Sequence, residues 1–522
     1  MPAKTLMIQG TGSGVGKSLL VTALCRILHR QGIQVAPFKA VNMSNNASVT
    51  QDGGEIATAQ AVQAKACGIE PVVEMNPVLL KPTADHSSQV IVSGRPIGVV
   101  AAADFRHLRE KLLGAIERSL KTLIDSYEFI VIEGAGSPAE INLQETDLAN
   151  MAVARLADAP VILVADIDRG GAFASMIGTL ELLEERDRER VKGFLINKFR
   201  GDPALLQSGI DWLEKRTRRP VLGVIPFLQD VRIPEEDSLA ERLMNPYVIP
   251  AKAGIRLRPD PRLRGDDICD RPIRVQVVRY PMISNFTDFD PLRGEPDVSL
   301  EYLTRPPSSE DPPHLLIFPG SKSTVSDLTW LRQAGFDRYA AACMEGGAEI
   351  LGICGGFQML GGMIYDPNHV ESEVAAVPGL SLLPTNTLFL PSKVTAQVKG
   401  VHLESGEPVT GYEIHAGRLQ GSRRGKPVFK ILERGGSDVQ EWDGCQLPQK
   451  KIWGTYLHGL FESDRFRRWF LGRLRPLSVQ PELSRRMNGA LKEDPYDALA
   501  DAVGPHLSLE RIGEISSWPL PV

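Results

Sequence analysis

The sequence predicts an α/β fold of two doubly wound domains, each with helices packed on a mainly parallel sheet. Short apolar runs alternate with helical patterns in residues 1–235 and again in residues 272–470, which is typical of parallel strands joined by helices. In each stretch one apolar run ends in a glycine-rich turn that leads into a helical pattern. The length of 522 residues also exceeds what one hydrophobic core usually supports. We therefore expect two domains, a linker at 236–271 and a helical extension at 471–522.

The composition argues against several classes of protein. The net charge of -5 gives no indication of a nucleic-acid partner. The six cysteines are scattered without Cys-x-x-Cys pairing, which argues against a disulfide framework and a structural zinc site. The chain opens without an apolar signal segment, and nowhere do 18 apolar residues follow one another. We expect a cytoplasmic protein with no membrane partner, and assembly into a homo-oligomer stays open.

The first glycine-rich turn has the order of elements that a P-loop needs. Thr5 to Gln9 is predicted as a strand, Gly10 to Ser18 as a loop and Leu19 to Arg30 as a helix. Such a loop cradles phosphates with its amides, its lysine reaches the β- and γ-phosphates, and its hydroxyl binds Mg²⁺. Thr11 stands where the standard spacing has its first glycine, so this loop is a variant. The residues expected to bind ATP here are Thr11, Gly12, Gly14, Val15, Gly16, Lys17 and Ser18.

Further strands are predicted at 33–38, 129–132, 161–165, 193–196 and 221–225. Several end in polar residues, where an open α/β sheet binds its ligands. Glu133 follows one strand and is a candidate Mg²⁺ ligand beside Ser18. Asp52 is a second candidate, although an aspartate before two glycines is also typical of a plain turn. Asn197 is placed to hydrogen-bond an adenine ring or simply to cap its strand.

Segments of this first domain resemble known families. The loop Gly10 to Ser18, Phe38-Lys39 and the run Glu133 to Gly136 resemble dethiobiotin synthetase and its relatives, which use ATP to phosphorylate a substrate carboxylate. Five more segments closely resemble the cobyric acid synthase family, the glutamine-dependent amidases of corrinoid biosynthesis: 41–46, 52–56, 75–82, 165–171 and 196–202.

This resemblance implies roles for individual residues. Lys17 and Lys39 would face phosphate and the reacting carboxylate. The residues that would hold Mg²⁺ are Ser18, Asp52 and Glu133, and Asn197 would face the base of ATP. The linker at 236–271 is rich in proline and arginine, and we interpret it as an exposed insertion. A clamp over an anionic substrate is the alternative for its arginines.

The second glycine-rich turn predicts a nucleophile elbow at Cys354. An apolar run from Ala348 to Ile353 breaks at this cysteine, and Gly355 and Gly356 open a helical pattern. The elbow presents a reactive side chain on a tight turn, and amides after the turn stabilise an oxyanion. The amide of Gly320, after the preceding strand, is the expected partner of the Gly355 amide. The alternative is a buried core cysteine without chemistry.

A thiol nucleophile needs a base. His458 is best placed because it follows an apolar strand of the same domain, and His415 is the rival. The pattern resembles class I glutamine amidotransferases, which implies that Cys354 attacks glutamine and releases ammonia. Many of those enzymes have a glutamate two residues after the histidine, where this chain has Leu460. The residue that orients His458 is therefore missing or replaced, and Glu462 is a weak substitute.

Taken together, the resemblance implies an ATP-, Mg²⁺- and glutamine-dependent ligase acting on a corrinoid. Its substrate would be adenosylcobyrinic acid a,c-diamide, amidated at the b, d, e and g carboxylates. Cobyrinic acid a,c-diamide synthase, which shares both modules, is the nearest alternative, and a non-catalytic P-loop switch is another. The stretches Asp494 to Asp501 and Leu507 to Ile515 predict a pair of helices that closes the second domain.

Overall fold

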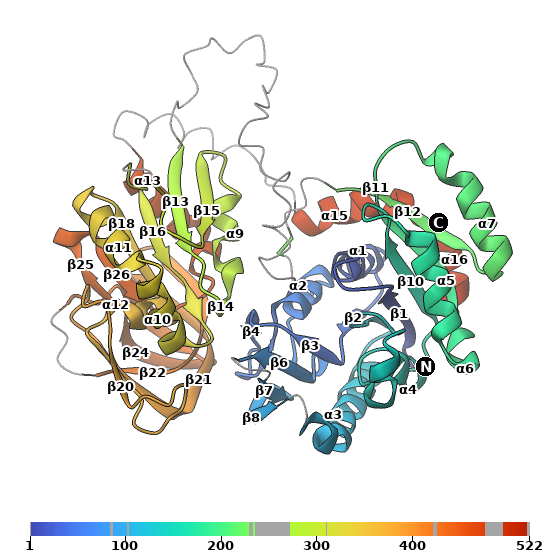
Figure 1. Ribbon diagram of the computed structural model, residues 1–522, viewed down its shortest axis with the longest axis horizontal. Helices are drawn as coiled ribbons and strands as arrows, with labels where there is room; N and C mark the ends of the chain where they lie inside the picture. The colour runs from blue at the N-terminus through green and yellow to red at the C-terminus, as the bar shows by residue number, and fades with distance from the viewer. Residues whose placement is uncertain are drawn as a thin grey trace, which may run out of the picture. The chain divides into compact units, whose positions relative to one another are not determined.

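The computed structural model describes residues 2–83, 87–101, 104–228, 233–234, 272–308, 311–420, 425–475 and 494–518 (Figure 1). The chain divides into two compact units, Met1–Glu236 with Lys492–Val522, and Asp237–Leu491. The predicted linker at 236–271 lies outside the described residues, so both of its interpretations stay predictions. Among the helices that are described, none is long and apolar enough to cross a membrane.

Unit 1 is built on a six-stranded parallel sheet that contains every strand predicted for the first domain. The strand order is β12(Val221–Pro226), β11(Val191–Phe199), β10(Val161–Asp166), β1(Lys4–Gly10), β9(Phe129–Glu133) and β2(Val35–Phe38). The strands at the centre of the sheet are almost wholly buried because both faces of the sheet are covered. β1 lies in the interior of the sheet, so the loop that follows it is held by neighbours on both sides.

Helices cover both faces of this sheet. Successive side chains of a strand point to opposite faces, and accordingly Met7 belongs to one core while Leu6 and Ile8 belong to the other. The core around Met7 is completed by α3(Phe105–Ser126), α4(Met151–Leu156), α5(Ala172–Leu182) and α7(Gln207–Thr217). The core around Leu6 and Ile8 is completed by α1(Lys17–Arg30), α15(Pro495–Val503) and α16(Leu509–Ser516). Unit 1 also contains α2(Thr58–Ala66) and α6(Glu185–Arg188).

The chain between β2 and α3 forms small sheets that the sequence did not reveal. A four-stranded sheet has the order β3(Val41–Met43), β6(Val78–Pro82), β7(Ser87–Val92) and β8(Arg95–Ala101). A separate two-stranded ribbon consists of β4(Ala47–Val49) and β5(Glu55–Ala57). Most of these strands are three to five residues long, too short for a clear alternation of apolar and polar residues.

The prediction that the C-terminal helices close the second domain is wrong. In the structure α15 packs on α1, where Leu499 and Val503 enter the core of unit 1. Arg26 of α1 pairs with Asp497 at 2.8 Å, and Arg30 pairs with Asp501 at 2.6 Å. The apolar stripe of α15 is therefore buried against α1 in unit 1.

Unit 2 contains a second doubly wound sheet. Its order is β15(Val298–Leu303), β13(Ile273–Val278), β16(Leu315–Phe318), β18(Glu349–Ile353), β26(Ile452–Thr455) and β25(Cys445–Leu447), of which the first five are parallel. The accompanying helices are α9(Asp290–Arg293), α10(Thr324–Gln333), α11(Phe336–Glu345), α12(Gly355–Leu360) and α13(Asp464–Leu474). Helix α13 runs across the predicted boundary at residue 470.

A largely antiparallel sheet accompanies the parallel one in unit 2 (Figure 1). Its strands are β20(Ala376–Pro378), β19(Met363–Tyr365), β21(Asn386–His402), β23(Phe429–Arg434) and β24(Ser437–Asp443), and β22(Pro408–Gln420) pairs with β21. Strand β22 carries His415. It is bridged at Tyr412 to His458, which follows β26, so the antiparallel sheet approaches the end of the parallel strands.

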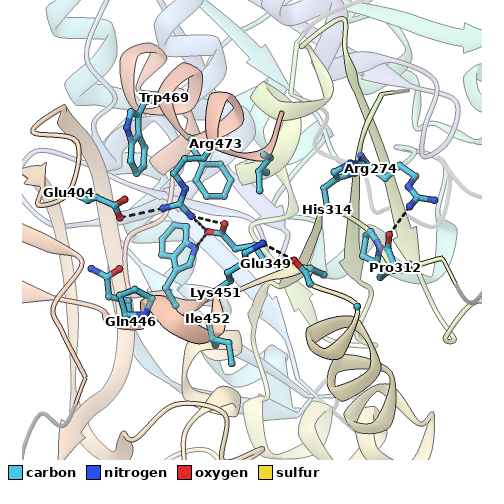
Figure 2. A pocket seen from close by; sticks show the side chains of 18 of the residues that line it. Arg274, Pro312, His314, Glu349, Glu404, Gln446, Lys451, Ile452, Trp469 and Arg473 are labelled. Carbon is cyan, nitrogen blue, oxygen red and sulfur yellow. Dashed lines mark hydrogen bonds and ion pairs between the residues drawn. The ribbon is translucent and has the colours of Figure 1, made fainter. Parts of the chain in front are cut away.

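A cavity of about 810 Å³ opens where β18 begins, at the opposite end of that strand from Cys354 (Figure 2). Glu349, the first residue of β18, is buried there and accepts hydrogen bonds from Trp453 Nε1 at 2.7 Å and from Arg473 Nη2 at 2.6 Å. The guanidinium of Arg473 also lies 5.1 Å from the Trp469 ring. These contacts neutralise the buried carboxylate, so we interpret this cluster as structural.

Replacing Arg473 with Met should destabilise unit 2, because the Glu349 carboxylate would stay buried without its counter-ion. We expect a loss of about 2 kcal/mol, which corresponds to a fall of about 5 °C in the thermal unfolding midpoint. The control is Lys399→Met, which removes an exposed pair with Glu433 and should change the midpoint by about 1 °C or less. Equal midpoints for the two variants would contradict a structural role for Arg473.

Candidate active sites

Cys354 sits on a strained turn between β18 and α12. Its φ of 50° and ψ of -107° lie in a backbone region that non-glycine residues rarely adopt. This conformation costs about 1–3 kcal/mol of strain. The following glycines allow the turn to pack closely: a Cβ on Gly356 would overlap the Phe318 carbonyl, and one on Gly355 would lie 2.9 Å from the Ser321 nitrogen. The sequence-predicted elbow therefore lies directly against the loop that follows β16.

His458 reaches this turn because β26 is the neighbour of β18, with Thr455 paired to Ile353. Its Nδ1 lies 2.7 Å from Asp288 Oδ2, and the Gly459 amide donates to Asp288 Oδ1 at 3.0 Å. Burial alone would lower the pKa of His458, but the charges of Asp288 and Cys354, and hydrogen bonds to both, raise the pKa to about 10. With Nδ1 engaged by Asp288, Nε2 is left for the sulfur.

Asp288 is the member of this site that the sequence interpretation missed. It lies in a short 3₁₀ helix, Phe286–Phe289, and is buried. No spacing rule connects it to His458, which follows 170 residues later. The only signal was the polar character of the segment around it. Glu462, the substitute considered from the sequence, is exposed. The carboxylate that contacts His458 is that of Asp288, so the usual glutamate is replaced and not missing.

The surroundings of His415 disfavour it as the base. Its Nδ1 lies 2.7 Å from the Gly417 carbonyl, and its ring stacks on Tyr456 with centroids 3.9 Å apart. Burial lowers the pKa of His415 to about 3, so the ring stays neutral at physiological pH. The neighbouring Ile414 carbonyl lies 3.5 Å from the Cys354 sulfur. Strand β22 therefore forms a wall of the site.

The two glycines predicted for the oxyanion hole are brought to the same place. Gly320 opens the two-residue strand β17(Gly320–Ser321), which pairs with β14(Ile283–Ser284). A Cβ on Gly320 would lie 3.0 Å from His458 Cε1, so only glycine leaves this space open. The hydrogen-bonding role of the Gly320 and Gly355 amides stays a prediction.

The P-loop of unit 1 curls over the end of β1 as predicted. Gly14 and Gly16 have φ values of 68° and 96°, which glycine adopts without strain. Lys17 Nζ donates to the Gly12 carbonyl at 3.0 Å and to the Gly136 carbonyl at 3.2 Å. The lysine is thus folded back over its own loop, toward the end of β9.

Glu133 gathers the polar groups of this site. It is 1% exposed, and it accepts hydrogen bonds from Ser18 Oγ at 2.8 Å, Lys39 Nζ at 2.9 Å and Gln63 Nε2 at 2.6 Å. A carboxylate next to a serine hydroxyl supplies the hard oxygen donors that Mg²⁺ prefers. Two of the three predicted metal ligands therefore meet here. Gln63 was not singled out from the sequence.

Asp52 and Asn197 have other neighbours. Asp52 lies in an exposed turn, where it accepts a hydrogen bond from Thr50, which fits the alternative of a plain turn residue. Asn197 is buried and donates to the Val15 carbonyl at 2.8 Å, and Lys198 donates to the Gly14 carbonyl at 2.6 Å. Both residues lie near the end of β11 and support the P-loop, and Lys198 was not predicted to do so. The metal role of Asp52 and the adenine role of Asn197 stay predictions.

Comparisons with known proteins divide the chain in the same way. Residues 6–240 match the CobQ/CobB/MinD/ParA nucleotide binding domain, and residues 274–466 match the CobB/CobQ-like glutamine amidotransferase domain. The chain is 48% identical over 530 residues to the cobyric acid synthase of Moorella thermoacetica, covering 100% of this chain and 98% of that protein. It is 46% identical over 521 residues to the cobyric acid synthase of Chloroflexus aurantiacus, covering 98% and 99%. The match to the solved structure of PurLQS from Thermotoga maritima has 19% identity and a TM-score of 0.30, and it covers 39% of this chain and 100% of that one.

Replacing Asp288 with Asn should impair glutamine hydrolysis. Without the carboxylate charge the pKa of His458 falls from its raised value, so the imidazolium loses its proton at lower pH. We expect the rate to fall about 100-fold and the alkaline limb of the pH profile to move toward neutral pH. Initial rates of glutamate release between pH 6 and about 10 would show both effects.

Glu462→Gln is the matched control, since it makes the same chemical change at the exposed carboxylate. It should leave the rate and the profile unchanged. An Asp288→Asn enzyme whose alkaline limb stays in place, or a Glu462→Gln enzyme with an equal defect, would rule out Asp288 as the orienting group.

Proposed function

This chain belongs to the cobyric acid synthase family, and from that premise we propose that it amidates the b, d, e and g carboxylates of adenosylcobyrinic acid a,c-diamide. ATP activates each carboxylate, and glutamine supplies the nitrogen. The observation that supports this most directly is the presence of two complementary centres in one chain. One is the Cys354, His458 and Asp288 arrangement, and the other is the P-loop with Glu133.

The residues of unit 2 account for the release of ammonia. The Cys354 sulfur attacks the side-chain carbonyl carbon of glutamine, and the amides of Gly320 and Gly355 stabilise the oxyanion. The thiol proton is held on His458, whose raised pKa favours the imidazolium, and it passes to the leaving nitrogen, so that the C–N bond breaks and ammonia departs. Water then hydrolyses the γ-glutamyl thioester to glutamate. Asp288 holds the imidazole in the tautomer that this exchange needs.

The residues of unit 1 account for activation of the acceptor. A substrate carboxylate oxygen attacks the γ-phosphorus of ATP, ADP leaves, and an acyl phosphate forms. Ammonia attacks the acyl carbon, and phosphate departs with the former carboxylate oxygen. Lys17 and Lys39 carry the positive charge that this transfer requires. Ser18 and Glu133 would hold Mg²⁺, which neutralises phosphate charge when bound.

The same proposal places the enzyme in the cytoplasm, where ATP and glutamine are available, with no membrane or nucleic-acid partner. Asp52 as a further Mg²⁺ ligand and Asn197 at the adenine ring belong to it as well. Asp52 would have to contact Mg²⁺ in addition to Thr50, and Asn197 would have to contact adenine in addition to the Val15 carbonyl.

Mass spectrometry of adenosylcobyrinic acid a,c-diamide incubated with the protein, Mg-ATP and glutamine tests the reaction. We expect four successive exchanges of a hydroxyl for an amino group. An unchanged corrinoid, with cobyrinic acid converted to its diamide, would transfer the assignment to cobyrinic acid a,c-diamide synthase. ATP turnover that needs neither glutamine nor a corrinoid would favour a P-loop switch.

Two reciprocal variants test the division of labour. Cys354→Ser should lower glutamine-dependent amidation at least about 1,000-fold, yet retain amidation from added ammonia at raised pH. Lys17→Ala should lose amidation from either nitrogen source and keep glutamine hydrolysis. Amide formation and glutamate release, measured in parallel, separate the two. If the Cys354→Ser protein remains folded but amidates with neither glutamine nor added ammonia, the two-centre mechanism is wrong.

A further inference from the structure

A large cavity of unit 1 is not used by the chemistry described so far. It has a volume of about 1240 Å³ and lies between α3, the small sheet with β3 and β6, and the loop after β9. Its apolar lining includes Val41, Met43, Val78, Leu80 and Phe105. Met43 is 64% exposed, which is unusual for so large an apolar side chain. This lining would suit the face of a bulky, mainly apolar ligand.

The cavity borders the activating centre. Gly136, in its wall, is the residue whose carbonyl accepts the hydrogen bond from Lys17 Nζ at 3.2 Å. Val41, also in the lining, begins β3 two residues after Lys39, which pairs with Glu133. A ligand in this cavity would therefore lie beside both lysines.

Two arginines of α3 give this cavity positive charge that no described acidic residue of its lining neutralises. Arg106 and Arg109 are three residues apart and line it from one helix face. Within the described part of the chain, Arg109 Nε is buried and has no hydrogen-bond partner. The other two arginines of the lining are paired, Arg155 with Asp187 at 2.6 Å and Arg186 with Glu184 at 2.9 Å.

A buried guanidinium nitrogen without a partner is costly, and a carboxylate is the group that satisfies it best. Two acidic residues in the cavity wall do not accept a hydrogen bond from Arg109 Nε. Asp147 accepts hydrogen bonds from the Ala149 amide of its own loop and from the Ala152 amide of α4, and Glu140 is exposed. The cavity thus combines an apolar floor with an unsatisfied cationic edge.

We infer that this cavity binds the corrinoid, with the macrocycle against the apolar floor and a peripheral carboxylate at Arg106 and Arg109. This rests on the proposed function for the identity of the ligand. A carboxylate held there is not the one that reacts, because the reacting group must reach Lys17 and Lys39. Arg106 and Arg109 would therefore fix the ring while another carboxylate is presented to ATP.

Kinetics of Arg109→Gln in the full-length protein test the inference. We expect the KM for adenosylcobyrinic acid a,c-diamide to rise about 10-fold or more, as loss of a charged hydrogen bond predicts. The KM for ATP and the rate of glutamine hydrolysis should not change. Equilibrium binding of the corrinoid, followed by its visible absorbance after ultrafiltration, should weaken by the same factor.

Arg118→Gln is the matched control, since it removes the same charge from an exposed position of the same helix, and it should bind the corrinoid like the wild type. Arg109→Lys, which keeps the charge, should recover part of the affinity and guards against a variant that fails to fold. Equal corrinoid affinities for Arg109→Gln, Arg118→Gln and wild type would overturn the site while leaving the reaction intact. A wild-type protein that amidates no corrinoid would overturn the proposed function itself.

Discussion

Parallel strands bring their carboxyl ends to one edge of a sheet, and both reacting centres depend on that constraint. In unit 2, residues that follow β16, β18 and β26 meet because these strands are neighbours, so Gly320, Cys354 and His458 lie together. In unit 1, the loops after β1 and β9 meet for the same reason, and Ser18 contacts Glu133. The order of the strands, more than any single contact, determines which side chains meet at each site.

The buried carboxylates at these sheet edges need hydrogen-bond donors from the protein. Glu133 is surrounded by Ser18, Lys39 and Gln63, and Asp288 by the His458 ring and the Gly459 amide. An ionised carboxylate without such partners would be neutralised by burial. These donors satisfy the oxygens of both buried carboxylates and fix their positions beside Ser18 and His458.

The parts of the fold that could be predicted are those with local signals. The P-loop, the elbow at Cys354 and the strand before His458 are each contained in about ten residues of sequence. Asp288 could not be found in this way, because its partner lies 170 residues along the chain and the contact is made only by the tertiary fold. The short strands from β3 to β8 gave no periodicity to detect. The helix α15 was recognised as a helix, yet its amphipathic pattern does not say which core it covers.

The docking of α15 on α1 has a consequence for the order in which the two units can finish folding during translation. Domains generally fold from the N-terminus as the chain leaves the ribosome. Here the helix α1, which carries Lys17 and Ser18, buries part of its surface under residues that are translated after the whole of unit 2. The nascent first unit must therefore wait, with an apolar face open, until unit 2 has also been translated.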